Sequence, residues 1–165
     1  MRKTLIALLL LTALVARAED PIRPDPKLTP GAVMPGVTVE QIMEKGYANK
    51  LNGGVRQVTA AEKRQVFIAY FGRVPGMKGH YEIDHLISLE LGGSNDPKNL
   101  WPESYYTEPF NAKLKDKLED RMAADVRHEP ERHGHDAATK LLQQFQHEIA
   151  TDWIAAYHKY VSPTP

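Results

Sequence analysis

Apolar residues recur every four positions along two long stretches of the C-terminal half, and this period limits the possible folds more than any other feature. The first stretch carries Phe110, Leu114, Leu118, Met122 and Val126. The second carries Leu141, Phe145, Ile149, Trp153 and Tyr157. Because a spacing of four places side chains on one face of an α-helix, we predict helices over residues 110–127 and about 136–160. The polar, glycine-containing residues 128–135 predict a loop between them.

The middle of the chain predicts one further helix and a pair of short strands. Thr59 and Glu62 have the spacing of a capping box, and Gly72 is placed to end the helix that this box begins. Residues 81–86 alternate in the manner of a strand, and residues 92–97 are rich in turn formers. A second short strand resumes at Asn99, and we expect Pro102 to stop it. The fold class is therefore α+β and mostly helical, with a small two-stranded unit and flanking helices.

The first eighteen residues have the pattern of a cleaved secretory signal. Arg2 and Lys3 precede an apolar run over residues 5–15, and Ala16-Arg17-Ala18 provides small residues at the positions that a signal peptidase reads. The alternative is a membrane anchor, but the run is short for a bilayer, which takes roughly 20 residues. We expect cleavage near Glu19, no membrane association afterwards, and a periplasmic or secreted protein.

After residues 1–18 we expect a proline-rich N-terminal extension over residues 19–58 and one domain over residues 59–165. Five prolines between residues 21 and 35 favour an extended path for the start of the extension. The chain has no cysteine, so its core is held without disulfides and a thiolate zinc site is excluded.

The charge balance argues weakly against a nucleic-acid partner. The chain has 21 basic and 21 acidic residues, and loss of residues 1–18 would remove three bases and no acid. A mildly acidic protein of this kind is not held to a polyanion by its bulk charge, so binding would need a local basic patch or a metal ion.

The stretch YEIDHLISLELGGSNDPKN, residues 81–99, combines an acid, a histidine and an asparagine around a glycine turn. His85 would face a groove shared with the start of the 110–127 helix. Asp84 would reach the same site only if the strand ends or twists there. Asn99, fourteen residues after His85, could hydrogen-bond backbone groups across the turn and so fix the strand that carries the histidine. The alternative is a structural histidine and a turn-capping aspartate.

Three pairs in this stretch, Asp84-His85, Gly92-Gly93 and Asn99-Leu100, resemble the HNH endonuclease signature in their spacing. The likeness continues in DPKLTPGAV, in the GYA element at Gly46 and in NAKLKDKLEDRM, which are similar to segments of exported bacterial HNH-type proteins. It covers most of the mature chain. It implies a ββα-metal (His-Me finger) core.

The resemblance also implies the roles of the site residues. His85 would be the general base, Asp84 and Asn111 the metal ligands, and Asn99 a structural member of the catalytic group. Lys115 would contact phosphate or stabilise the transition state, although the lysines of this helix could form only a solvated face. Relatives often have histidine in the place of Lys113, and a protonated lysine cannot bind a metal.

An oxygen pair with open positions suits one Mg²⁺ or Mn²⁺ ion in preference to Zn²⁺ or Ni²⁺. For the histidines of residues 128–135, we expect a solvated linker and no metal cluster.

The function that the sequence predicts is metal-dependent hydrolysis of phosphodiester bonds in DNA, with RNA as a second substrate class. The alternative is a catalytically weak or inactive HNH-fold protein that binds nucleic acid or an envelope partner. Lys113 and the acidic net charge favour the alternative modestly.

Overall fold

The computed structural model describes residues 21–48, 54–76 and 79–162. Over these residues the chain is a mixed α+β protein with one two-stranded antiparallel sheet. The predicted signal peptide, residues 1–18, lies outside them. No helix in the described part of the chain is both long and apolar enough to cross a bilayer.

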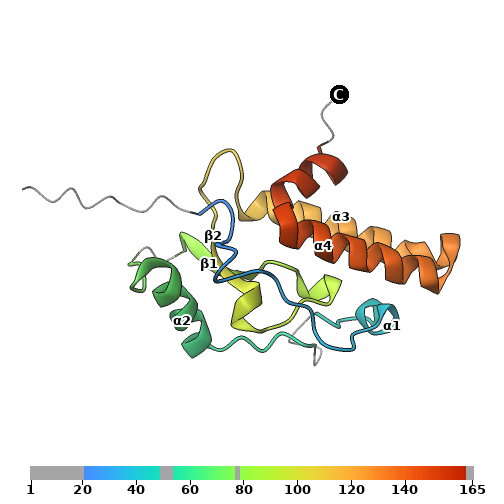
Figure 1. Cartoon of the computed structure of the whole chain (residues 1–165), viewed down its shortest axis with the longest axis horizontal. Coiled ribbons are helices and arrows are strands. Elements are labelled where there is room, and N and C mark those ends of the chain that lie inside the picture. The colour runs from blue at the N-terminus through green and yellow to red at the C-terminus, as the bar shows by residue number, and fades with distance from the viewer. Residues whose placement is uncertain (1–20, 49–53, 77–78, 163–165) are drawn as a thin grey trace, which may run out of the picture.

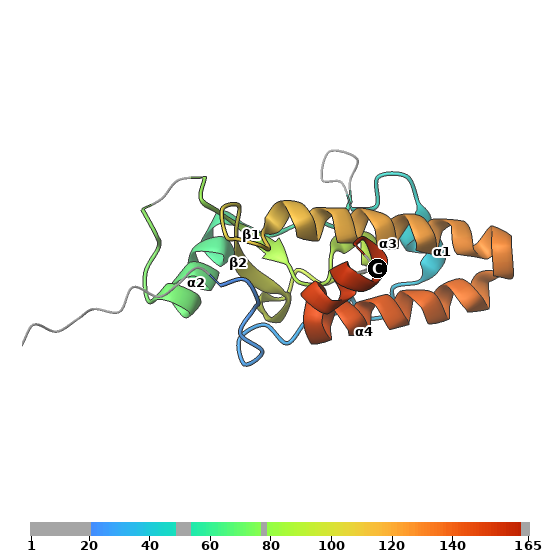
Figure 2. The ribbon, with the colours of Figure 1, turned by 90° about the horizontal axis from the view of Figure 1, so that it is seen from above.

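Two long helices, α3 (Ala112–His133) and α4 (His135–Tyr160), run side by side along most of the molecule (Figures 1 and 2). Their apolar stripes face each other, and Leu118, Met122 and Phe145 are almost completely buried between them. The two helices that the four-residue period predicts are therefore confirmed. Burial of these large side chains supplies much of the stabilisation of the fold, at about 1.5–3 kcal/mol for each.

The loop predicted over residues 128–135 is wrong, because α3 continues through it to His133. Only Gly134 separates the two helices, and its φ of 90° lets the chain reverse direction there. The polar residues before it stay helical because this end of α3 is exposed and needs no apolar partner. His133 Nδ1 lies 2.9 Å from Glu129 Oε1, a contact between neighbouring turns of the helix.

Helix α4 is broken at Asp152, whose φ of −161° and ψ of 97° are extended. The Asp152 carboxylate accepts hydrogen bonds from the backbone N–H of Ile154 at 3.0 Å and of Ala155 at 3.3 Å, and so caps the final helical segment. Arg23 binds the same carboxylate at 3.1 Å. This break bends the end of α4 back over the earlier turns of the same helix, where Lys159 donates to Glu148 at 2.8 Å, and the bend is visible near the C-terminus in Figure 1.

The sheet is a hairpin of β1 (Tyr81–His85) and β2 (Leu100–Ser104). We expected Pro102 to end the second strand, but β2 continues past it to Ser104, so this prediction is wrong. Pro102 lies opposite Ile83 in a two-stranded sheet, where both strands are edges. An edge strand tolerates proline because half of its backbone N–H groups have no partner strand.

Helix α2 (Ala60–Phe71) covers the hairpin at the end of the molecule away from the α3–α4 turn (Figure 2). The predicted capping box is present, with Thr59 and Glu62 bonded reciprocally, and Gly72 ends the helix in the left-handed conformation. Val66 of α2 forms a small apolar cluster with two residues of the sheet, Ile83 and Leu100.

The N-terminal segment is part of the domain's core as well as its surface. Residues 21–37 follow an extended path across the turn after β1, where the Gly31 N–H donates to the Lys98 carbonyl at 3.0 Å. The short helix α1 (Val39–Met43) buries Val39 and Ile42 in the core beside α3 and α4. The proline-rich region therefore packs against the site-bearing turn.

The turn between the strands contains two 3₁₀ helices, η2 (Leu89–Leu91) and η3 (Pro97–Asn99), with a pair of glycines between them. Gly92 has a φ of 74°. At Gly93 an added Cβ would lie 1.8 Å from the Ile87 carbonyl oxygen, so only glycine fits. The Gly-Gly pair thus allows the chain after His85 to fold back tightly.

Candidate functional site

His85 is the last residue of β1, and its side chain is almost fully buried at the end of the hairpin. Its Nε2 lies 3.1 Å from the Asn95 amide oxygen. Its Nδ1 is buried and has no hydrogen-bond partner within the described residues. Burial lowers the pKa of His85, while the Asp84 carboxylate acts in the opposite direction without cancelling the effect. The imidazole is therefore neutral at neutral pH, as a general base requires.

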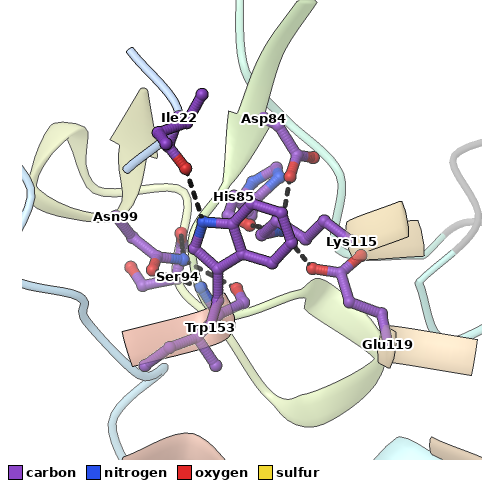
Figure 3. Close-up of polar contacts among 9 residues, drawn as sticks. Ile22, Asp84, His85, Ser94, Asn99, Lys115, Glu119 and Trp153 are labelled. Atoms are coloured by element: carbon purple, nitrogen blue, oxygen red, sulfur yellow. Dashed lines mark hydrogen bonds and ion pairs between the residues drawn. The ribbon is translucent and has the colours of Figure 1, made fainter. Parts of the chain in front are cut away.

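Asn99 holds the turn that follows His85. Its amide oxygen accepts from the Ile87 N–H at 3.0 Å and from the Ala32 N–H at 3.3 Å. Its amide nitrogen donates to the Ile87 and Ser94 carbonyls, each at 2.9 Å (Figure 3). All four bonds go to backbone groups, so Asn99 acts on the position of the strand end.

The Lys115 ammonium is completely buried beneath the hairpin. Its Nζ donates to Asp84 Oδ2 at 2.6 Å, to the His85 backbone oxygen at 2.8 Å and to Glu119 (Figure 3). An ammonium has three hydrogens, so these contacts use all of them. Lys115 therefore stands as a link between α3 and the Asp84-His85 pair, with no donor left for a phosphate in this arrangement.

Lys115 lies among three carboxyl groups, and we call Asp84, Glu103, Lys115 and Glu119 the lysine cluster. Burial raises the pKa of Asp84, but the Lys115 ammonium outweighs burial and leaves that pKa below its ordinary value. Burial raises the pKa of Glu119 to about 8 against the opposing effect of Lys115. Burial also raises the pKa of Glu103 well above its ordinary value, with Asp84 in hydrogen-bond contact. At neutral pH Asp84 carries a negative charge, and burial raises the pKa of Glu103 and of Glu119 and so favours their protonated forms.

Sequence reasoning missed Glu103 and Glu119. Glu119 lies four residues after Lys115, a spacing that does signal a contact along a helix. Glu103 lies opposite Glu82 in the sheet register, and its burial depends on how α3 crosses the hairpin. No local sequence pattern gives that crossing.

Asn111 is the N-cap residue of α3, one helical turn before Lys115, but its side chain does not cap the helix. Its amide nitrogen donates to the Thr107 carbonyl at 3.2 Å. Its amide oxygen is buried and has no hydrogen-bond partner among the described residues. The structure thus brings Asp84, His85 and Lys115 into direct contact, and it leaves Asn111 on the same helix face as Lys115 without a hydrogen bond to any of them. Lys113 is exposed.

The unpaired amide oxygen of Asn111 and the carboxylate of Asp84 are the oxygen ligands that we predicted for a divalent cation. Two oxygen ligands suit Mg²⁺ or Mn²⁺, which take their other ligands from water and phosphate. The described residues contain no group of three or more His, Cys, Asp or Glu side chains that could hold a metal ion. The fit therefore depends on the aspartate and the asparagine alone.

A cleft of about 800 Å³ opens beside the lysine cluster, and Glu119 borders both. Among the residues that the structure describes, the charged lining of the cleft consists of five acids and two arginines: Glu44, Glu90, Asp116, Glu119, Asp120, Arg56 and Arg127. Arg127 is paired with Glu90 at 2.8 Å. Arg56 is close enough to His85 to help lower its pKa. Arg56 is therefore a cation that this cleft shares with the surroundings of His85.

Comparison of the chain with models of known protein families, with curated proteins and with solved structures found no match.

Proposed function

We propose that the chain is an HNH-type endonuclease that hydrolyses phosphodiester bonds in DNA, with RNA as a second substrate class. The observation that carries this proposal is the His85 side chain, a neutral imidazole with one nitrogen bonded to Asn95 and the other unpaired. The order of β1, β2 and α3 and the Asp84-His85 pair support the proposed ββα-metal core.

In the proposed reaction, His85 takes a proton from the water that attacks phosphorus, a step worth about 10²–10⁴ in rate. Asn99 keeps the end of β1 in place by its four backbone bonds. Lys115 neutralises Asp84 and donates a hydrogen bond to the His85 carbonyl, and so holds the end of β1 against α3. Asp84 and Asn111 would hold Mg²⁺ or Mn²⁺, which when bound supplies positive charge to the transition state and to the departing 3′ oxygen.

The test uses purified mature protein, supercoiled plasmid, and Mg²⁺ or Mn²⁺, with EDTA as the metal-free arm. We expect nicked and linear plasmid from the wild type, and cleavage by His85→Ala slower by about 100-fold or more. His133→Ala is the matched control, because His133 is exposed and distant in sequence from the site. If the wild type and His85→Ala leave the plasmid equally intact, or cut it at the same rate, the proposal fails.

The acidic lining of the cleft favours a second candidate, an HNH-fold protein of weak or no activity that binds nucleic acid or an envelope partner. It predicts that the wild type leaves plasmid intact with either metal. A retarded oligonucleotide in the same preparation would then identify nucleic-acid binding, and no retardation would favour an envelope partner.

A further inference from the structure

Asn95 lies in the turn between η2 and η3 and joins the His85 imidazole to the chain segment before α2. Its amide oxygen lies 3.1 Å from His85 Nε2. Its amide nitrogen donates to the Val55 carbonyl at 2.7 Å, and the Gln57 N–H donates to its amide oxygen at 3.4 Å. The side chain therefore has a backbone partner on each end of its amide group.

These two backbone contacts fix which end of the amide faces the histidine. If the amide were turned over, its oxygen would face the Val55 carbonyl and its NH₂ group would face the Gln57 N–H. Both contacts would then be repulsive, because each would pair two acceptors or two donors. The oxygen of Asn95 therefore faces His85, and an oxygen can only accept a hydrogen bond.

An acceptor at Nε2 requires that the hydrogen of the neutral imidazole sits on Nε2. The other nitrogen, Nδ1, then has a free lone pair, and it is the nitrogen that is buried without a partner. From this geometry we infer that Asn95 is a positioning residue, which holds His85 in the Nε2–H tautomer and leaves Nδ1 to take the proton. The inference rests on the proposed function for its catalytic meaning, but the tautomer itself can be measured without any activity.

The first experiment is a long-range ¹H–¹⁵N correlation spectrum of the full mature protein with ¹⁵N-labelled histidine at pH 8. His85→Gln assigns the His85 signals by their loss. We expect the wild type to show a protonated Nε2 and an unprotonated Nδ1. In Asn95→Ala the His85 signals should move toward a mixture of tautomers. A protonated Nδ1 in the wild type, or identical tautomers in wild type and Asn95→Ala, would overturn the inference.

Ser94→Ala is the matched control. The Ser94 hydroxyl oxygen accepts a hydrogen bond from the Asp96 N–H at 3.0 Å in the same turn, and it does not contact the imidazole. Ser94→Ala should leave the His85 tautomer unchanged. If Asn95→Ala fails to fold, the wild-type tautomer still decides the matter.

The second experiment is kinetic and separates this inference from the proposed function. For plasmid cleavage, Asn95→Ala should lower kcat by about 10- to 100-fold, as loss of a partner that orients a site histidine commonly does, with KM little changed. A normal kcat in Asn95→Ala would refute the positioning role. If the wild type cuts no nucleic acid, the proposed function fails. The tautomer spectra alone then test whether Asn95 holds His85 in the Nε2–H tautomer.

Discussion

Replacement of Lys115 by methionine should destabilise the fold strongly, because it removes the only cation of the lysine cluster. Methionine keeps the length and the apolar stem of the side chain, so the change isolates the ammonium. The variant loses hydrogen bonds to Asp84, to the His85 carbonyl and to Glu119 together. Asp84 is then left as a buried carboxylate with no positive partner.

The expected loss is about 3 kcal/mol in the free energy of unfolding at pH 7. Removal of one partner from a fully buried ion pair costs about 3–5 kcal/mol. The lower end applies because the side chains of Asp84 and Glu119 retain 16% and 14% exposure, and because Glu119 is mainly protonated at this pH. Lys115 lowers the pKa of Asp84, so its stabilisation is present above the ordinary aspartate pKa and is lost as the pH falls through the lowered value. The difference between wild type and variant should therefore narrow as the pH approaches and passes below about 4.

Urea unfolding followed by circular dichroism measures this loss at pH 7 and at about pH 3, below the ordinary aspartate pKa. Lys117→Met is the matched control, since Lys117 lies on the same helix but is exposed, and it should change stability by less than about 0.5 kcal/mol. The double variant Lys115→Met with Asp84→Asn should recover part of the loss, because the unpaired charge is gone. A Lys115→Met protein as stable as Lys117→Met at pH 7 would refute the reasoning.

Three further predictions follow from single features. Gly93→Ala should prevent folding or lower the free energy of unfolding by more than about 3 kcal/mol, because its Cβ would overlap the Ile87 carbonyl oxygen. Gly76→Ala, whose Cβ would meet open space, should be nearly neutral in the same unfolding assay. Burial raises the pKa of Glu119 to about 8, so the folded protein holds a proton that the unfolded chain releases. The free energy of unfolding of the wild type should therefore fall from about pH 5 to pH 8 more steeply than that of Glu119→Gln, and equal slopes would contradict this. Asn111→Ala should weaken Mn²⁺ binding, followed by electron paramagnetic resonance, by about tenfold or more, and unchanged binding would remove Asn111 from the ligand set.

Local sequence patterns predicted the elements whose cause is local. The capping box of Thr59 and Glu62 and the four-residue apolar period each act within one helix, and both helices and box are present. The predictions that failed assumed that polar residues or proline interrupt regular structure. At residues 128–133 an exposed helix end needs no apolar face, and at Pro102 an edge strand tolerates a missing donor.

The site was harder to predict because its contacts join residues far apart in the chain. Helical periodicity places Lys115 in a row with Asn111 and Glu119, and a lysine in such a row usually faces solvent. It is buried here because the hairpin brings in Asp84, which lies 31 positions earlier in the sequence. Asn95 likewise reads as one more turn residue, and its contact with His85 arises only when the turn folds back on the strand.

The lysine cluster also bears on the objection that an acidic protein is a poor partner for a polyanion. Three carboxyl groups beneath the end of β1 would repel a phosphate if all were ionised. Burial raises the pKa of Glu103 and of Glu119 and so favours their protonated forms, and Lys115 offsets the charge of Asp84, so the cluster carries less negative charge than three ionised carboxyl groups would. The three hydrogens of Lys115 go to Asp84, the His85 carbonyl and Glu119, so in the proposed reaction charge stabilisation at phosphorus would come from a cation at Asp84 and Asn111 or from Arg56. Lys115 thus supports the proposed chemistry by removing a repulsion, and direct contact with the substrate is not needed for that role.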